Sequence, residues 1–253
     1  MMKLVVAYIR LLAFFAFTAI WMPIVMLAIV LVPGSFVYYQ VAAPWITGLL
    51  KLFGATVVPH GLEKLRFDRE YVILSNHRSQ LDPPAIASLL LPRVTRWVAK
   101  KELRRVPILG QALQMSGQIF IDRGDPSAAV EELSRHTRDR GVIICFFPEG
   151  HRSSTYKLLP FKKGGAAFAI SAGLPVVPVA ISGSEIALPN HSIVSSPATI
   201  HVAFGDPIET SGMTADDRVA LTERVRDEIQ RMLQELDPHP QPVAAPKPAA
   251  AAA

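Results

Sequence analysis

The 253-residue chain has a single cysteine, Cys145, in the apolar run from Val142 to Phe147. One cysteine excludes a disulfide within the chain, and its apolar surroundings favour a small buried core residue. There is no zinc-finger spacing and no basic stretch interleaved with aromatic residues, so we expect no nucleic-acid partner. Basic residues outnumber acidic ones by 26 to 21, which favours an anionic partner such as a phospholipid surface or a phosphorylated substrate.

Charged residues are absent over a long stretch near the N-terminus, from Leu11 to Leu50. Within it, residues 11–32 are interrupted only by Pro23. A helix of that length spans about 33 Å, which matches the hydrocarbon core of a bilayer. The apolar core of a cleaved signal peptide is shorter, and so long an uncharged stretch is difficult to bury in a domain of this size. We therefore predict that residues 1–56 form a membrane-attached helical segment.

The second part of the uncharged stretch, residues 35–50, contains three aromatic residues, Tyr38, Tyr39 and Trp45. Tyrosine and tryptophan favour the headgroup interface of a membrane. Two arrangements fit this pattern. One is a membrane span followed by an interfacial helix, and the other is a shallow hairpin of two helices.

The remaining chain divides into a globular domain over residues 57–236 and a tail over residues 237–253. The tail is rich in proline and alanine and is predicted to be disordered. In the domain, apolar runs alternate with helical patterns, which predicts an α/β fold with a mostly parallel sheet flanked by helices. The expected strands are 71–75, 95–99, 118–122, 142–147, 176–181 and 199–204, and the expected helices are 83–91, part of 102–115, 126–139, 164–172 and 215–236.

The first candidate site follows the strand 71–75, in the stretch NHRSQLD of residues 76–82. On one continuous helix His77 and Asp82 would face different ways, so a contact between them requires a turn, which Pro83 favours. A carboxylate beside an imidazole holds its tautomer and lets it take a proton from a hydroxyl. An alternative role for Asp82 is the N-cap of the following helix, and the two roles are compatible.

The second candidate site, FPEGHRS of residues 147–153, follows the strand 142–147. Ends of parallel strands share one edge of a sheet, so both candidate sites are expected to face one cleft. Arg152 could clamp a phosphate with two hydrogen bonds, and Glu149 could bond substrate. The alternative is a solvated turn with Gly150 in an unusual conformation. A third group of charges, including Arg123, lies at the exit of the strand 118–122.

Taken in order, these stretches resemble the glycerophospholipid acyltransferase family, particularly its 1-acyl-glycerol-3-phosphate acyltransferases. The matching stretches are NHRSQLD, GQIFIDR, FPEGHRS and LPVVPVA, with VAKKELRRVPILG and LLPFKKGGAAFAI around them. Each motif alone is weak, but four in this order at family-like spacing are highly specific. The resemblance covers roughly residues 71–182.

The resemblance implies transfer of a fatty acyl group from acyl-CoA or acyl-carrier protein to the free sn-2 hydroxyl of a lysophospholipid, 1-acyl-glycerol-3-phosphate, without a cofactor or metal. His77 would be the general base and Asp82 its partner. The substrate-binding residues would be Asn76, Lys100, Arg123, Glu149, Gly150 and Arg152. The resemblance also implies association with membrane lipid, with the catalytic domain on the cytoplasmic face.

One position departs from the family pattern, because His151 stands where threonine is usual. It lies inside the expected acceptor-binding stretch, so another acceptor, such as a lyso-ornithine lipid, remains an alternative. Two other classes are a metal phosphohydrolase that uses His and Asp as ligands and a non-catalytic lipid-binding module. The first would need several more ligands, and the sequence offers no second HD pair or Cys/His pair.

Overall fold

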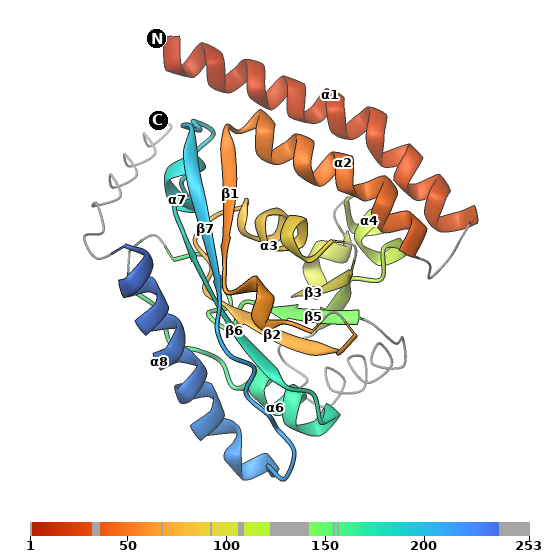
Figure 1. The fold of residues 1–253 in the computed structure, drawn as a ribbon. Coiled ribbons are helices and arrows are strands. Elements are labelled where there is room, and N and C mark those ends of the chain that lie inside the picture. Colours follow the sequence, from red (N-terminus) through yellow and green to blue (C-terminus); the bar gives the residue numbers. More distant parts are fainter. Residues whose placement is uncertain are drawn as a thin grey trace, which may run out of the picture.

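The computed structural model describes residues 2–31, 36–66, 68–91, 93–105, 109–121, 142–153, 155 and 157–237 (Figure 1). Its helices are α1 (Met2–Leu31), α2 (Phe36–Leu52), α3 (Asp82–Leu90), α4 (Leu109–Met115), α6 (Gly164–Ala172), α7 (Ser184–Ala187) and α8 (Arg218–Leu236), with short 3₁₀ turns η1 (Leu62–Lys64), η2 (Lys101–Arg105) and η3 (Ala215–Asp217). Its strands are β1 (Ala55–His60), β2 (Tyr71–Ser75), β3 (Val94–Lys100), β4 (Ile119–Ile121), β5 (Val142–Phe146), β6 (Val176–Ser182) and β7 (Ala198–Phe204).

The seven strands form one sheet in the order β1-β7-β6-β2-β5-β3-β4. All neighbours pair in parallel except β6 and β7, which are antiparallel. Every residue of β2, β5 and β6 is buried, as expected of strands covered on both faces. The predicted α/β fold with a mostly parallel sheet is therefore confirmed.

The core lies on both faces of this sheet, and β2 contributes to both by alternation. Tyr71 and Ile73 pack with α2 and α3, whereas Val72 and Leu74 pack with α6 and α8. Figure 1 shows these helix pairs on opposite sides of the sheet. Cys145 is fully buried on the α2–α3 side, which confirms its predicted place in the core. Burial raises the pKa of its thiol.

Two strand features differ from the sequence-based predictions. The strand β1 was not predicted, although its residues pair with β7 throughout. It is short, contains Pro59 and is exposed at half of its positions, so it lacks the apolar run typical of a buried strand. β7 was predicted as a strand, but its antiparallel direction was not predicted. The helix predicted over residues 126–139 lies outside the described residues.

The N-terminal helices α1 and α2 lie side by side and turn back on one another (Figure 1). The indole Nε1 of Trp21 donates to the carbonyl of Val41 at 2.8 Å, which ties the two together. α2 joins the core through Leu49, Leu50 and neighbouring side chains. α1 remains largely exposed, and within the described residues its segment Leu4–Ala28 has the length and mean hydropathy, 2.3, of a membrane span. α1 is thus a candidate membrane segment.

Candidate active site

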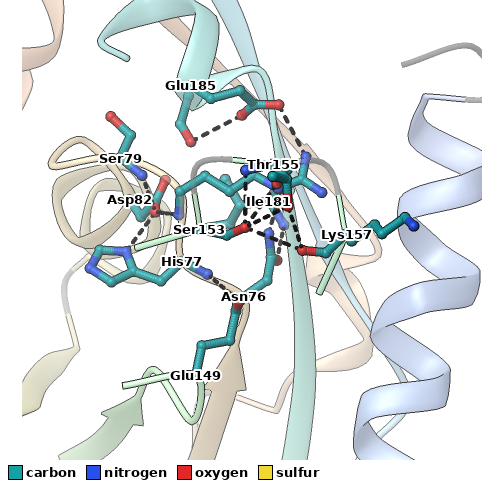
Figure 2. Close-up of polar contacts among 12 residues, drawn as sticks. Asn76, His77, Ser79, Asp82, Glu149, Ser153, Thr155, Lys157, Ile181 and Glu185 are labelled. Atoms are coloured by element: carbon teal, nitrogen blue, oxygen red, sulfur yellow. Dashed lines mark hydrogen bonds and ion pairs between the residues drawn. The ribbon is translucent and has the colours of Figure 1, made fainter. Parts of the chain in front are cut away.

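The first site residues lie on the loop that joins β2 to α3. The imidazole Nδ1 of His77 lies 2.7 Å from Oδ2 of Asp82. Figure 2 shows the two side chains pointing toward one another. Asp82 is fully buried, whereas the His77 side chain is 17% exposed. The turn that the sequence required for this contact is therefore present.

Asp82 is held by the backbone of its own loop. Its Oδ2 also accepts the N–H groups of Arg78 at 2.7 Å and Ser79 at 2.8 Å. Three donors on one oxygen stabilise the ionised carboxylate. Oδ1 has no hydrogen-bond partner among the described residues. The N-cap role considered for Asp82 is wrong, because α3 begins at Asp82 itself, its N-cap is Leu81, and the carboxylate bonds backward into the loop.

The His77 ring is fixed by aromatic stacking as well as by Asp82. It stacks on Phe147 with ring centroids 3.9 Å apart and an angle of 13° between the planes. Phe147 stacks in turn on Trp97 of β3, at 5.2 Å and 14°. The sequence analysis did not find this stack, because its three members come from three separate segments. With Nδ1 donating to Asp82, Nε2 is left as an acceptor, and no described residue bonds to it.

The loop after β5 holds the backbone of His77 from both sides. Oε1 of Glu149 accepts the N–H of His77 at 2.8 Å, and the N–H of Ser153 donates to the His77 carbonyl at 2.8 Å. Oε2 of Glu149 accepts the N–H of Leu159 at 3.0 Å. Glu149 is buried, and burial raises its pKa, although these backbone bonds oppose the rise. Both predicted sites are thus joined at His77, as expected of one cleft.

Gly150 and Arg152 lie on the outer part of the same loop. Gly150 has a φ of +79°, which confirms the unusual conformation predicted for it. The Arg152 side chain is half-buried, and its guanidinium makes no hydrogen bond or ion pair with the described residues. Its backbone carbonyl accepts the side-chain Nδ2 of Asn190 at 3.3 Å.

The remaining predicted substrate-binding residues have different surroundings. Asn76 is fully buried, and its side-chain amide both donates to and accepts from the backbone of Ile181, at 2.9 and 2.8 Å, which ties the end of β2 to β6. Lys100 is the last residue of β3. Arg123 lies outside the described residues. The substrate-binding roles of these three residues stay predictions.

The arrangement is typical of one class of enzyme: an α/β protein in which an imidazole, bonded to a buried carboxylate, lies at the end of a central strand. Within the described ranges, no group of three or more His, Cys, Asp or Glu side chains could hold a metal ion. An acyltransferase family model matches residues 56–182. The chain belongs to this acyltransferase family.

Several relatives by sequence carry the same name. The chain is 34% identical over 209 residues to the 1-acyl-sn-glycerol-3-phosphate acyltransferase of Saccharomyces cerevisiae, covering 78% of this chain and 68% of that protein. It is 38% identical over 142 residues to that of Cocos nucifera, covering 55% and 46%. It is 31% identical over 189 residues to the mouse alpha enzyme, covering 73% and 66%. The chain thus spans about half to two thirds of the length of several such relatives.

The fold is similar to a solved structure as well. The crystal structure of the 1-acyl-sn-glycerophosphate acyltransferase PlsC from Thermotoga maritima matches with a TM-score of 0.77 and 22% identity. The match covers 94% of this chain and 99% of that one. It therefore includes the N-terminal helices as well as the sheet.

Proposed function

We propose that this chain transfers a fatty acyl group from acyl-CoA or acyl-carrier protein to the free sn-2 hydroxyl of 1-acyl-glycerol-3-phosphate, giving phosphatidic acid. The observation that carries the proposal is the contact between Nδ1 of His77 and Oδ2 of Asp82, which leaves Nε2 as a free acceptor. The family match and the name shared by the relatives support the substrate class.

In the first step, Nε2 of His77 takes the proton of the acceptor hydroxyl while the hydroxyl oxygen attacks the carbonyl carbon of the thioester. A new C–O bond forms, and the carbonyl π pair moves to oxygen, giving a tetrahedral intermediate. Asp82 stabilises the imidazolium formed at His77. No side chain of the protein needs to become acylated, because the acceptor alcohol is itself the nucleophile.

In the second step, the tetrahedral intermediate collapses. The carbonyl reforms as the C–S bond breaks, and the thiolate leaves with the electron pair of that bond. The imidazolium of His77 gives its proton to this sulfur, so the products are the ester and a free thiol. The base returns to its neutral form, and the cycle needs neither a metal nor a redox cofactor.

The acceptor phosphate is proposed to bind at Arg152. Its half-buried guanidinium has no partner among the described residues, and Arg152 lies three residues along the loop from Glu149, which bonds His77. A guanidinium can hold two phosphate oxygens at once. Lys100, Arg123 and Gly150 are proposed to complete the acceptor site.

Membrane attachment is proposed through α1, whose apolar side chains are exposed along much of its length. Exposed apolar surface of this extent is typical of a membrane-interacting segment. The catalytic domain is proposed to lie on the cytoplasmic face, since both donor thioesters are intracellular. The acceptor and the product are membrane lipids, so attachment brings the base to its substrate.

The test is an acceptor screen with purified protein in detergent, read by lipid mass spectrometry. Lysophosphatidic acid, lysophosphatidylglycerol and a lyso-ornithine lipid are each offered with acyl-CoA and with acyl-carrier protein. We expect phosphatidic acid as the main product, and its loss in His77→Ala protein. Acylation of the lyso-ornithine lipid alone would replace the proposed acceptor. Lipid binding that survives His77→Ala, with no acyl transfer in wild type, would instead establish a binding module.

A further inference from the structure

Arg78 follows the proposed base in the chain, but its side chain points into the protein. Only 5% of the side chain is exposed, and its Nη1 donates to Oε1 of Glu185 at 3.0 Å. Its backbone N–H donates to Oδ2 of Asp82. One residue therefore connects the carboxylate that orients the imidazole with a second buried carboxylate.

Glu185 lies on α7, which a rigid turn places over the catalytic loop. Gly183, just before α7, has a φ of +88°, and a Cβ there would come within 2.1 Å of the Thr199 carbonyl oxygen. The Glu185 side chain is 5% exposed. The Ser79 hydroxyl donates to the Leu188 carbonyl at 2.8 Å, a second link between the loop and the end of α7.

Three buried carboxylates thus lie near Arg78: Glu185 bonds its guanidinium, Asp82 accepts its backbone N–H, and Glu149 is influenced by its charge. Burial raises the pKa of Glu185, and the charge of Arg78 opposes that rise. Burial also raises the pKa of Glu149, with backbone bonds and Arg78 acting against it. Asp82 raises the pKa of Glu185, as expected of two carboxylates near each other. Figure 2 shows Glu185, Asp82 and Glu149 around the loop that carries His77.

Among the described residues, Asp82 of α3 bonds Nδ1 of the His77 ring, and Phe147 from the loop after β5 stacks on it. Glu149 bonds the backbone N–H of His77, Trp97 of β3 stacks on Phe147, and the Arg78–Glu185 pair lies behind the loop and reaches α7. Buried charges act on one another strongly because water screens them poorly. A charge left unpaired behind the loop would therefore act on the imidazole with little screening.

We propose that Arg78 and Glu185 are positioning residues that balance charge behind the catalytic loop and thereby set the proton affinity of His77. Neither residue needs to touch substrate. The pair cancels one positive and one negative charge behind the loop, and Asp82 is the carboxylate in direct contact with the imidazole. This inference rests on the proposed function for its kinetic consequence, but not for its effect on the imidazole.

The opposing explanation is that the pair serves only the fold. A buried ion pair that loses one partner usually destabilises a protein, so a lower melting temperature alone would not separate the two explanations. The sign of the shift in the His77 pKa separates them. Glu185→Gln leaves an unbalanced positive charge and should lower the His77 pKa, whereas Arg78→Gln leaves excess negative charge and should raise it.

The experiment titrates the histidine ring resonances of the full chain by NMR and measures the pH profile of kcat/KM on the same proteins. The chain has seven histidines, and the His77→Ala protein assigns the resonance of interest. We expect Glu185→Gln to move both the His77 pKa and the acid limb of the profile down by about half to one pH unit. Arg78→Gln should move both upward.

Charge-conserving variants separate charge from shape. Arg78→Lys keeps the positive charge and should retain the wild-type His77 pKa even where kcat falls. The double variant Arg78→Met/Glu185→Gln removes both charges and should return the pKa close to wild type. Glu209→Gln, which breaks the exposed Arg69–Glu209 pair, is the matched control and should change nothing.

Unchanged His77 pKa values in both single variants would overturn the inference, as would shifts of the same sign. If one single variant does not fold, the other still gives the sign. Failure of the proposed function is distinguishable, because wild-type protein would then transfer no acyl group while the ring titrations still shift. If the wild-type protein transfers acyl groups but neither single variant shifts the His77 pKa, only the charge-balance inference is wrong.

Discussion

At the scale of single residues, the imidazole proposed as the base is held by a carboxylate oxygen that three donors share. Oδ2 of Asp82 accepts hydrogen bonds from the imidazole and from two backbone N–H groups. The loop that carries Asp82 therefore fixes the carboxylate, which in turn orients His77. Phe147 limits the ring to one plane. The imidazole can therefore present Nε2 in one direction without help from substrate.

The clearest residue-scale prediction concerns the base itself. His77→Ala should lower kcat/KM for acyl transfer by about 10²–10⁴, the usual contribution of a positioned base. Asp82→Asn should lower it less, since Nδ1 loses its charged partner but the ring remains stacked on Phe147. Steady-state kinetics beside melting curves provide the measurement, with the surface variant His60→Ala as control. Folded His77→Ala protein with wild-type turnover would exclude the mechanism.

A second residue-scale prediction concerns Arg152. Lysine cannot reproduce the two-point hold of a guanidinium, so Arg152→Lys should raise the KM for lysophosphatidic acid by roughly 10–150-fold, the equivalent of about 1.5–3 kcal/mol. The KM for the acyl donor and the melting temperature should change little. Equal changes in both KM values would argue against a phosphate contact.

At the scale of elements, the sequence predicts strands best where both faces of the strand are buried. β2, β5 and β6 read as apolar runs because both faces of each strand are covered. β1 was not predicted, because its exposed residues and Pro59 interrupt the apolar pattern expected of a paired strand. The motif loops were located correctly since strand ends display them. The bonds of Asn76 to Ile181 and of Glu149 to His77 could not be predicted, because these partners lie far apart in sequence.

An element-scale prediction follows from the turn before α7. Gly183→Ala adds a Cβ that meets the Thr199 carbonyl oxygen and forces a left-handed conformation on alanine. We expect a loss of stability of about 1–3 kcal/mol. Thermal unfolding gives the measurement, and Gly212→Ala, also at positive φ but with open space around it, separates clash from backbone strain. Equal melting temperatures for the two variants would show that the clash is relieved.

At the scale of the whole molecule, the N-terminal helices are not one detachable unit. α2 places Leu49 and Leu50 in the core beside α3, whereas α1 is mostly exposed. A polar contact of Arg10 with Ser195 ties α1 to the catalytic domain. The sequence predicted a single anchoring segment over residues 1–56, and the structure divides its physical roles between the two helices.

Two truncations test that division. Removing residues 2–31 should release the protein from phospholipid vesicles while leaving a folded domain, because the core keeps α2. Removing residues 2–50 should also lower the melting temperature sharply, by loss of several buried apolar side chains. Vesicle sedimentation at high salt and thermal unfolding are the measurements. A shorter truncation that still sediments fully would show that α1 is not the anchor.

The pairing of β1 with β7 also has a consequence for how the chain is made. Ala55 lies opposite Ala198, so β1 leaves the ribosome long before its partner exists. At about 5–20 residues per second, the intervening 143 residues (198 minus 55) take roughly 7–29 seconds to synthesise. During that time α1 is already free to meet a bilayer. The nascent chain can therefore bind the lipid surface first and complete its sheet there, with the edge strand β1 pairing last.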